Sequence, residues 1–139
     1  MIYVDTSVLL AQLLAEDRHP AEAFWSQTLV SSRLLEYEMW VRLNARRLTR
    51  SHGDDAQMLI GRVGLLELVS PVVARALEPF PEPVRTLDAL HLATADFLRQ
   101  RHAAVQLATY DPRLAAAARA IGIPLHALTA SSGASVPRR

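Results

Sequence analysis

The chain of 139 residues contains no cysteine and no lysine. Without cysteine it forms neither a disulfide framework nor a thiolate metal site. Because all 15 basic residues are arginine, any mechanism that requires a lysine is excluded. No apolar run approaches the roughly 20 residues of a membrane-spanning helix, and the first residues lack the basic stretch and cleavage site of a signal peptide. These absences predict a cytoplasmic protein with no membrane partner.

Half of the residues are hydrophobic, which excludes disorder for most of the chain. The length suits one domain with a proper core. The net charge of +1 does not by itself predict a polyanionic partner. The function therefore has to be inferred from the placement of individual residues.

Short apolar strands alternate with helical segments along the chain. Strands are expected at 2–4, 28–31, 65–69, 105–109 and 123–126, and helices at about 8–14, 20–27, 33–50, 54–64, 72–77, 86–101 and 113–120. This alternation is typical of an α/β fold with a central, mostly parallel twisted sheet of four to five strands and helices on both faces. We expect one domain over residues 1–128 and a flexible tail over the Ser/Gly/Pro-rich residues 129–139.

Two aspartates stand at equivalent places, between a predicted strand and a predicted helix. Asp5 follows the first strand, and Asp111 follows the fourth. Because parallel strands end at the same edge of a sheet, the two carboxylates should lie at that edge, where ligands bind in open α/β sheets. A capping role is the alternative, although Thr6 or Ser7 is a natural cap for the first helix. One residue can serve both purposes.

Three further acids lie on predicted helices. Asp88 is in the first turn of an otherwise apolar, central helix, so it should have a partner; with no lysine available, an external cation is a reasonable substitute. Glu36 and Glu38 lie early in the helix at 33–50. The apolar spacing does not settle which of these two points inward, although Glu38 occupies an apolar slot in the stripe and is favoured.

Acids that converge on one point repel each other. At ~4 Å, each pair costs a few kcal/mol at an effective dielectric constant of about 20. Such a cluster persists only by taking up protons or by holding a cation. Oxygen ligands without cysteine or histidine suit Mg²⁺ or Mn²⁺, and such an ion can activate water against a phosphodiester.

Four segments of the chain resemble the motifs of PIN-domain ribonucleases, specifically VapC-type toxins of bacterial toxin–antitoxin pairs. They are residues 3–7 (YVDTS), 32–38 (SRLLEYE), 87–93 (LDALHLA) and 108–114 (ATYDPRL). Each motif carries an acid of the family pattern. The second motif contains both Glu36 and Glu38, and its serine, six residues before the acid of the pattern, selects Glu38. The resemblance makes residues 1–128 a single PIN-like domain.

The resemblance implies a metal-dependent endoribonuclease that hydrolyses RNA phosphodiesters with a metal-activated water. Its catalytic and metal-binding acids would be Asp5, Glu38, Asp88 and Asp111, holding one or two Mg²⁺ or Mn²⁺ ions. The hydroxyls of Thr6, Ser7 and Thr109 would orient those ligands or water. His91 belongs to the third motif, but we expect it to pack or to form a hydrogen bond and not to bind metal.

The resemblance also implies partners: RNA, a second copy of the chain in a homodimer, and a cognate VapB-like antitoxin in a higher assembly, its tail entering the acidic groove. Arg42, Arg46 and Arg47 follow Glu38 along the chain and form either a solvated basic face or a phosphate rail for RNA. A catalytically silent PIN-fold binding protein and a structure-specific DNA nuclease are the alternative functions. The sequence decides neither the RNA that is cut nor a contribution from Glu36.

Overall fold

A computed structural model describes residues 1–102 and 104–132 of the chain. Four strands form one sheet in the order β3-β2-β1-β4. They are β1 (Ile2–Val4), β2 (Leu29–Ser32), β3 (Gly64–Leu66) and β4 (Gln106–Ala108). Every pairing is parallel, and β1 lies between β2 and β4. The predicted α/β class with a parallel sheet is confirmed.

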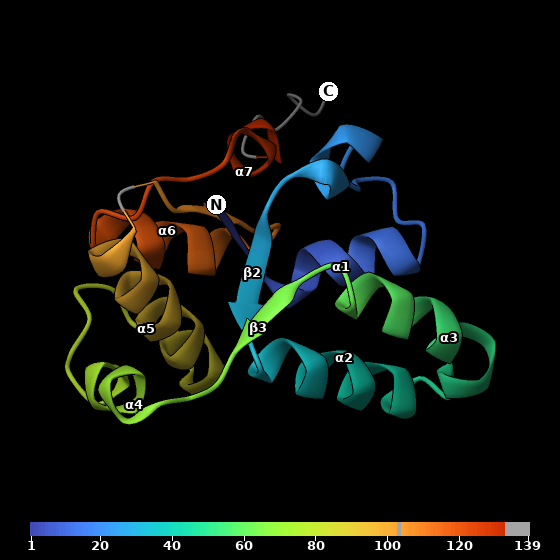
Figure 1. The fold of residues 1–139 in the computed structure, drawn as a ribbon, viewed down its shortest axis with the longest axis horizontal. Helices are drawn as coiled ribbons and strands as arrows, with labels where there is room; N and C mark the ends of the chain where they lie inside the picture. Colours follow the sequence, from blue (N-terminus) through green and yellow to red (C-terminus); the bar gives the residue numbers. More distant parts are fainter. Residues whose placement is uncertain (103, 133–139) are drawn as a thin grey trace, which may run out of the picture.

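Helices cover both faces of this sheet, as predicted (Figure 1). In chain order they are α1 (Thr6–Leu13), the short 3-10 helix η1 (Glu22–Ser26), α2 (Leu34–Ala45), α3 (Thr49–Ile60), α4 (Ser70–Ala76), α5 (Thr86–Arg101), α6 (Pro112–Ala120) and α7 (Ala127–Ser132). Figure 1 shows α1, α2 and α3 on one side of the sheet, and α4, α5 and α6 on the other. None of the helices in the described ranges combines the length and hydrophobicity that a bilayer crossing requires.

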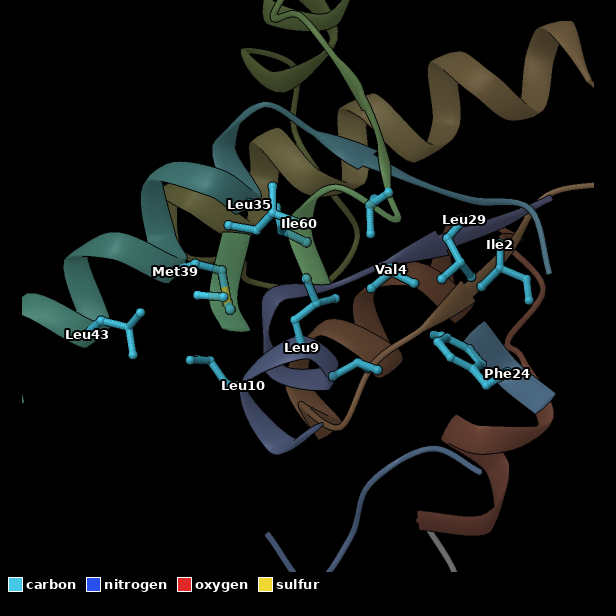
Figure 2. Close-up of a cluster of buried hydrophobic side chains, with 14 residues drawn as sticks. Ile2, Val4, Leu9, Leu10, Phe24, Leu29, Leu35, Met39, Leu43 and Ile60 are labelled. Carbon is cyan, nitrogen blue, oxygen red and sulfur yellow. The ribbon is translucent and has the colours of Figure 1, made fainter. Parts of the chain in front are cut away.

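The alternation of side chains along β1 divides the core in two. Ile2 and Val4 are buried on one face with the side chains of α1, α2 and α3, and Figure 2 shows this cluster. Tyr3 is buried on the opposite face with α5 and α6. Because successive side chains of a strand point to opposite faces, a strand of three residues supports both layers. Asp5 directly follows this doubly buried strand.

The helix expected at 33–50 is wrong, because the chain turns after α2. Arg47 has a φ of 56° in this turn, and the N–H of Leu48 donates to the carbonyl of Leu43 at 2.8 Å. The turn lets α3 pack back against α2. The helix expected at 54–64 instead runs from Thr49 to Ile60, so that Gly53 lies inside α3.

The carboxyl-terminal part also differs from the prediction. Residues 123–126 form only an isolated bridge between Leu107 and Leu125, because Pro124 has no N–H to donate to a ladder. Helix α7 covers the first residues of the segment 129–139 that was expected to be a flexible tail. Residues 133–139 of that predicted tail lie outside the described ranges.

Candidate active site

A pocket of about 540 Å³ lies beside the ends of β1 and β4. Its lining includes all four predicted acids, Asp5, Glu38, Asp88 and Asp111. Each acid comes from a different element: two cap the N-termini of α1 and α6, one lies in α2, and one lies in the first turn of α5. Segments more than a hundred residues apart in the chain thus bring their carboxylates to one pocket.

Asp5 is held by three donors on a single oxygen. Its Oδ2 accepts hydrogen bonds from the Ser7 hydroxyl at 2.7 Å, the Thr109 hydroxyl at 2.8 Å and the Ser7 N–H at 3.4 Å. Asp5 is only 6% exposed. Asp5, with extended backbone, caps α1, so its capping alternative is confirmed and the cap expected at Thr6 or Ser7 is wrong.

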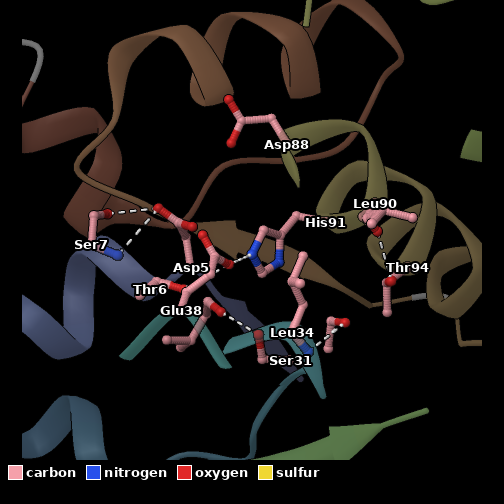
Figure 3. Close-up of polar contacts among 12 residues, drawn as sticks. Asp5, Thr6, Ser7, Ser31, Leu34, Glu38, Asp88, Leu90, His91 and Thr94 are labelled. Atoms are coloured by element: carbon pink, nitrogen blue, oxygen red, sulfur yellow. Dashed lines mark hydrogen bonds and ion pairs between the residues drawn. The ribbon is translucent and has the colours of Figure 1, made fainter. Parts of the chain in front are cut away.

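Glu38 is held by a hydroxyl and an imidazole. Its Oε1 accepts from the Thr6 hydroxyl at 3.1 Å and from Nε2 of His91, as Figure 3 shows. His91 is buried, so its expected role in packing and hydrogen bonding is what the structure displays. Burial opposes protonation of His91, but the contact with Glu38 and the charge of Asp5 outweigh it and raise the pKa of His91 above its ordinary value.

Asp88 and Asp111 share one arginine, which the sequence analysis missed. Arg85 donates from Nε to Asp88 at 3.1 Å and from Nη2 to Asp111 at 2.7 Å. The expectation that Asp88 has no cationic partner within the chain is therefore wrong. The search for a lysine passed over an arginine three residues earlier, a spacing that brings side chains together on a helix. Burial raises the pKa of Asp88 above its ordinary value, and Arg85 offsets part of that shift.

Asp111 also caps a helix. Its Oδ1 accepts from the N–H of Arg113 at 2.9 Å, with Pro112 at the first position of α6. Oδ1 of Asp111 thus caps α6, whereas its Oδ2 accepts a hydrogen bond from Arg85. This is the double use considered for both strand-end aspartates.

The remaining predicted residues divide between the pocket and the outer surface. Arg42 and Arg46 line the pocket, whereas Arg47 lies in the turn after α2 and is not part of the lining. Glu36 is also outside the lining and forms an exposed ion pair with Arg33 at 3.3 Å. Glu38 is therefore the acid of this helix that reaches the pocket.

The donor chemistry of the pocket fits a hard divalent cation. Asp5 Oδ1, Glu38 Oε2 and Asp88 Oδ1 each have no hydrogen-bond partner among the described residues. Carboxylate oxygens from separate elements, without sulfur, suit Mg²⁺ or Mn²⁺. In this conformation no three acidic or histidine side chains of the described ranges are drawn together as a chelating group. Arg85 instead neutralises two of the acids.

Comparison with known proteins gives this fold and site a family. Residues 2–120 match the model of the PIN domain. The chain belongs to the PIN-domain family, which confirms the resemblance seen in the four motifs. It is 32% identical to Ribonuclease VapC47 of Mycobacterium tuberculosis over 141 residues, covering 96% of this chain and 98% of that protein. It is also 32% identical to Ribonuclease VapC35 of Mycobacterium tuberculosis over 130 residues, covering 88% and 93%. No solved structure gave a significant match.

Proposed function

We propose that this protein is a metal-dependent endoribonuclease, the toxin of a toxin–antitoxin pair that acts in the cytoplasm. The observation that carries the proposal is the convergence of four carboxylates from four elements on one pocket. The two relatives, both named ribonucleases, match the chain over nearly all of their length. Together these findings favour hydrolysis of RNA over a purely structural role for the acids.

A divalent cation, Mg²⁺ or Mn²⁺, would be held by the free oxygens of Asp5, Glu38 and Asp88, with Asp111 as the fourth acid. When bound, such an ion activates water and neutralises charge that develops on a phosphate. The protein's own contribution is orientation. Ser7 and Thr109 fix one oxygen of Asp5, and Thr6 fixes one oxygen of Glu38; because these donors are in place beforehand, the acids need not reorganise.

The basic residues of the pocket supply attraction for RNA. Arg42 and Arg46 line the same hollow as the acids. Arginine binds phosphate through several N–H donors, so these two side chains would hold the phosphates that flank the cleaved bond. Arg47, outside the lining, would contribute only to the general attraction for the strand.

The proposed partners follow from the same pocket. A VapB-like antitoxin would silence the enzyme by placing a basic segment against the four acids, because an arginine already forms such contacts from within the chain. A homodimer and a larger toxin–antitoxin assembly complete the proposal.

The test is to map 5′ ends of cellular RNA after brief induction of the wild type, Asp5→Asn and Glu36→Gln. The wild type and Glu36→Gln should create the same new 5′ ends, because Glu36 lies outside the pocket. Asp5→Asn should create none. New ends that appear equally with Asp5→Asn would overturn the assignment of Asp5 to catalysis.

A further inference from the structure

A chain of buried polar contacts begins at the sheet and ends on Glu38. The N–H of Ser32 donates to the hydroxyl of Tyr3 at 3.2 Å, and that hydroxyl lies 2.7 Å from Nδ1 of His91. The other ring nitrogen of His91, Nε2, bonds with Oε1 of Glu38. Tyr3 is 0% exposed and His91 is 1% exposed. The contacts therefore run through the core behind the pocket and join β1, β2 and α5 to α2.

The donors and acceptors along this series of contacts place a hydrogen on Nε2 of His91. The carboxylate of Glu38 can only accept, so Nε2 of His91 carries the hydrogen of their shared bond. When the imidazole is neutral, Nδ1 accepts the phenolic hydrogen of Tyr3, because the Tyr3 oxygen already accepts from the N–H of Ser32. The contact with Tyr3 orients the histidine ring, and in the neutral state it favours the tautomer with the hydrogen on Nε2.

Simple packing does not account for these two residues. A phenol and an imidazole buried at the centre of an apolar layer are costly unless each polar atom is bonded, and a phenylalanine and a leucine would fill similar space. Here every polar atom of both side chains has a partner, and the last partner is a predicted catalytic acid. Both donors to Glu38, Thr6 and His91, reach the same oxygen, Oε1. This leaves Oε2 without a partner among the described residues.

We propose that Tyr3 and His91 are positioning residues, which hold Glu38 by Oε1 so that Oε2 is available to a divalent cation in the pocket. The proposal rests on the metal-dependent function proposed above. Neither Tyr3 nor His91 is among the residues that line the cavity, so both act through Glu38 and not by touching the cation or RNA. Histidines that orient a ligand in this way typically change metal affinity by 10- to 100-fold when they are replaced.

The first experiment measures Mn²⁺ binding by electron paramagnetic resonance for the wild type, His91→Leu and His91→Gln. His91→Leu removes the donor to Glu38 and should weaken Mn²⁺ binding by about 10- to 100-fold. His91→Gln places an amide nitrogen near the position of Nε2 and should restore most of the affinity. Wild-type affinity in a folded His91→Leu protein would overturn the positioning role.

A double-mutant cycle separates positioning from a general structural effect. In a Glu38→Gln background, His91→Leu should cause no further loss of Mn²⁺ affinity, because its effect passes through the Glu38 carboxylate. An equal loss in both backgrounds would show that His91 acts on something other than Glu38. That result would contradict the proposal even if His91→Leu alone weakens binding.

Two further measurements guard against a variant that fails to fold and against failure of the proposed function. Tyr3→Phe keeps the ring in the core, and loss of its hydroxyl should still weaken Mn²⁺ binding several-fold. Unchanged Mn²⁺ affinity in this variant would contradict a role for Tyr3 in positioning Glu38.

In the cation-free wild type, ¹⁵N NMR should place a hydrogen on Nε2 of His91. An Nε2 without a hydrogen would refute the proposed hydrogen bond to Glu38. A wild type that shows this pattern but binds no Mn²⁺ overturns the metal-dependent function and the proposal with it. If the wild type binds Mn²⁺ and the His91 and Tyr3 variants bind it equally well, only the positioning role is overturned.

Discussion

The two pairs of acids in the pocket are held in different ways. Asp5 and Glu38, the hydroxyl-held pair, accept hydrogen bonds from side chains of α1 and α5 and from Thr109, which directly follows β4. Asp88 and Asp111, the arginine-held pair, share the guanidinium of Arg85, whose side chain is 62% exposed. Ion pairs with an arginine this exposed contribute little to stability, and salt weakens them further. The fold therefore fixes the first pair in advance, whereas the second pair depends on one exposed guanidinium.

The largest effect should come from removing the divalent cation that we propose for this pocket. Cleavage of RNA by the purified protein should fall to background in EDTA, because the proposed mechanism requires the cation as its Lewis acid. Added Mn²⁺ or Mg²⁺ should restore it. A fluorescent RNA substrate measures both steps, and cleavage that persists in EDTA would point to a metal-free mechanism.

Asp5→Asn breaks the hydroxyl-held pair and should lower the cleavage rate by about 10²- to 10³-fold. The amide keeps the shape of the side chain but loses the charge, so circular dichroism should report an unchanged fold. Glu36→Gln, which changes an exposed acid outside the pocket, is the matched control and should cleave as the wild type does. A rate for Asp5→Asn within tenfold of the wild type would remove this acid from the site.

Arg85→Gln loosens the arginine-held pair. Without the guanidinium of Arg85, the variant should bind Mn²⁺ several-fold more tightly than the wild type at low ionic strength. Added salt should reduce this difference in Mn²⁺ affinity. The control is Arg33→Gln, because Arg33 bridges Glu36 and Glu67 outside the pocket in a similar exposed arrangement. Isothermal titration calorimetry measures both variants. Weaker Mn²⁺ binding by Arg85→Gln would mean that Arg85 assists the cation and does not compete with it.

The smallest effect concerns Asp88 and pH in the cation-free protein. Burial raises the pKa of Asp88 above its ordinary value of 3.8, so its contribution to stability is present below pH 3.8 and is lost as pH rises through the folded-state pKa. Asp88→Asn escapes that loss and should raise Tm by about 1 °C at pH 7 in EDTA, with no gain at pH 3. A lower Tm at pH 7 would show that the pairing with Arg85 outweighs burial.

Some parts of the site and fold could be predicted from the sequence, and others could not. Asp5 and Asp111 were found because strand-to-helix junctions of a parallel sheet meet at one edge, a rule that needs no side-chain detail. The turn that ends α2 at Ala45 was missed because no glycine or proline marks it, and Arg47 adopts a positive φ instead. Contacts between residues far apart in the sequence could not be predicted either, because they leave no local pattern. No spacing pairs Tyr3 with a histidine 88 positions away.

The account rests on one cation held between side chains that the sequence keeps far apart. The most direct measurement is anomalous X-ray scattering from crystals of the protein soaked in Mn²⁺. The account predicts a manganese peak inside the pocket, in contact with Asp5 and at least one other acid of the four, and no such peak with Asp5→Asn. Peaks confined to other surfaces of a wild-type protein that still cleaves RNA would contradict it.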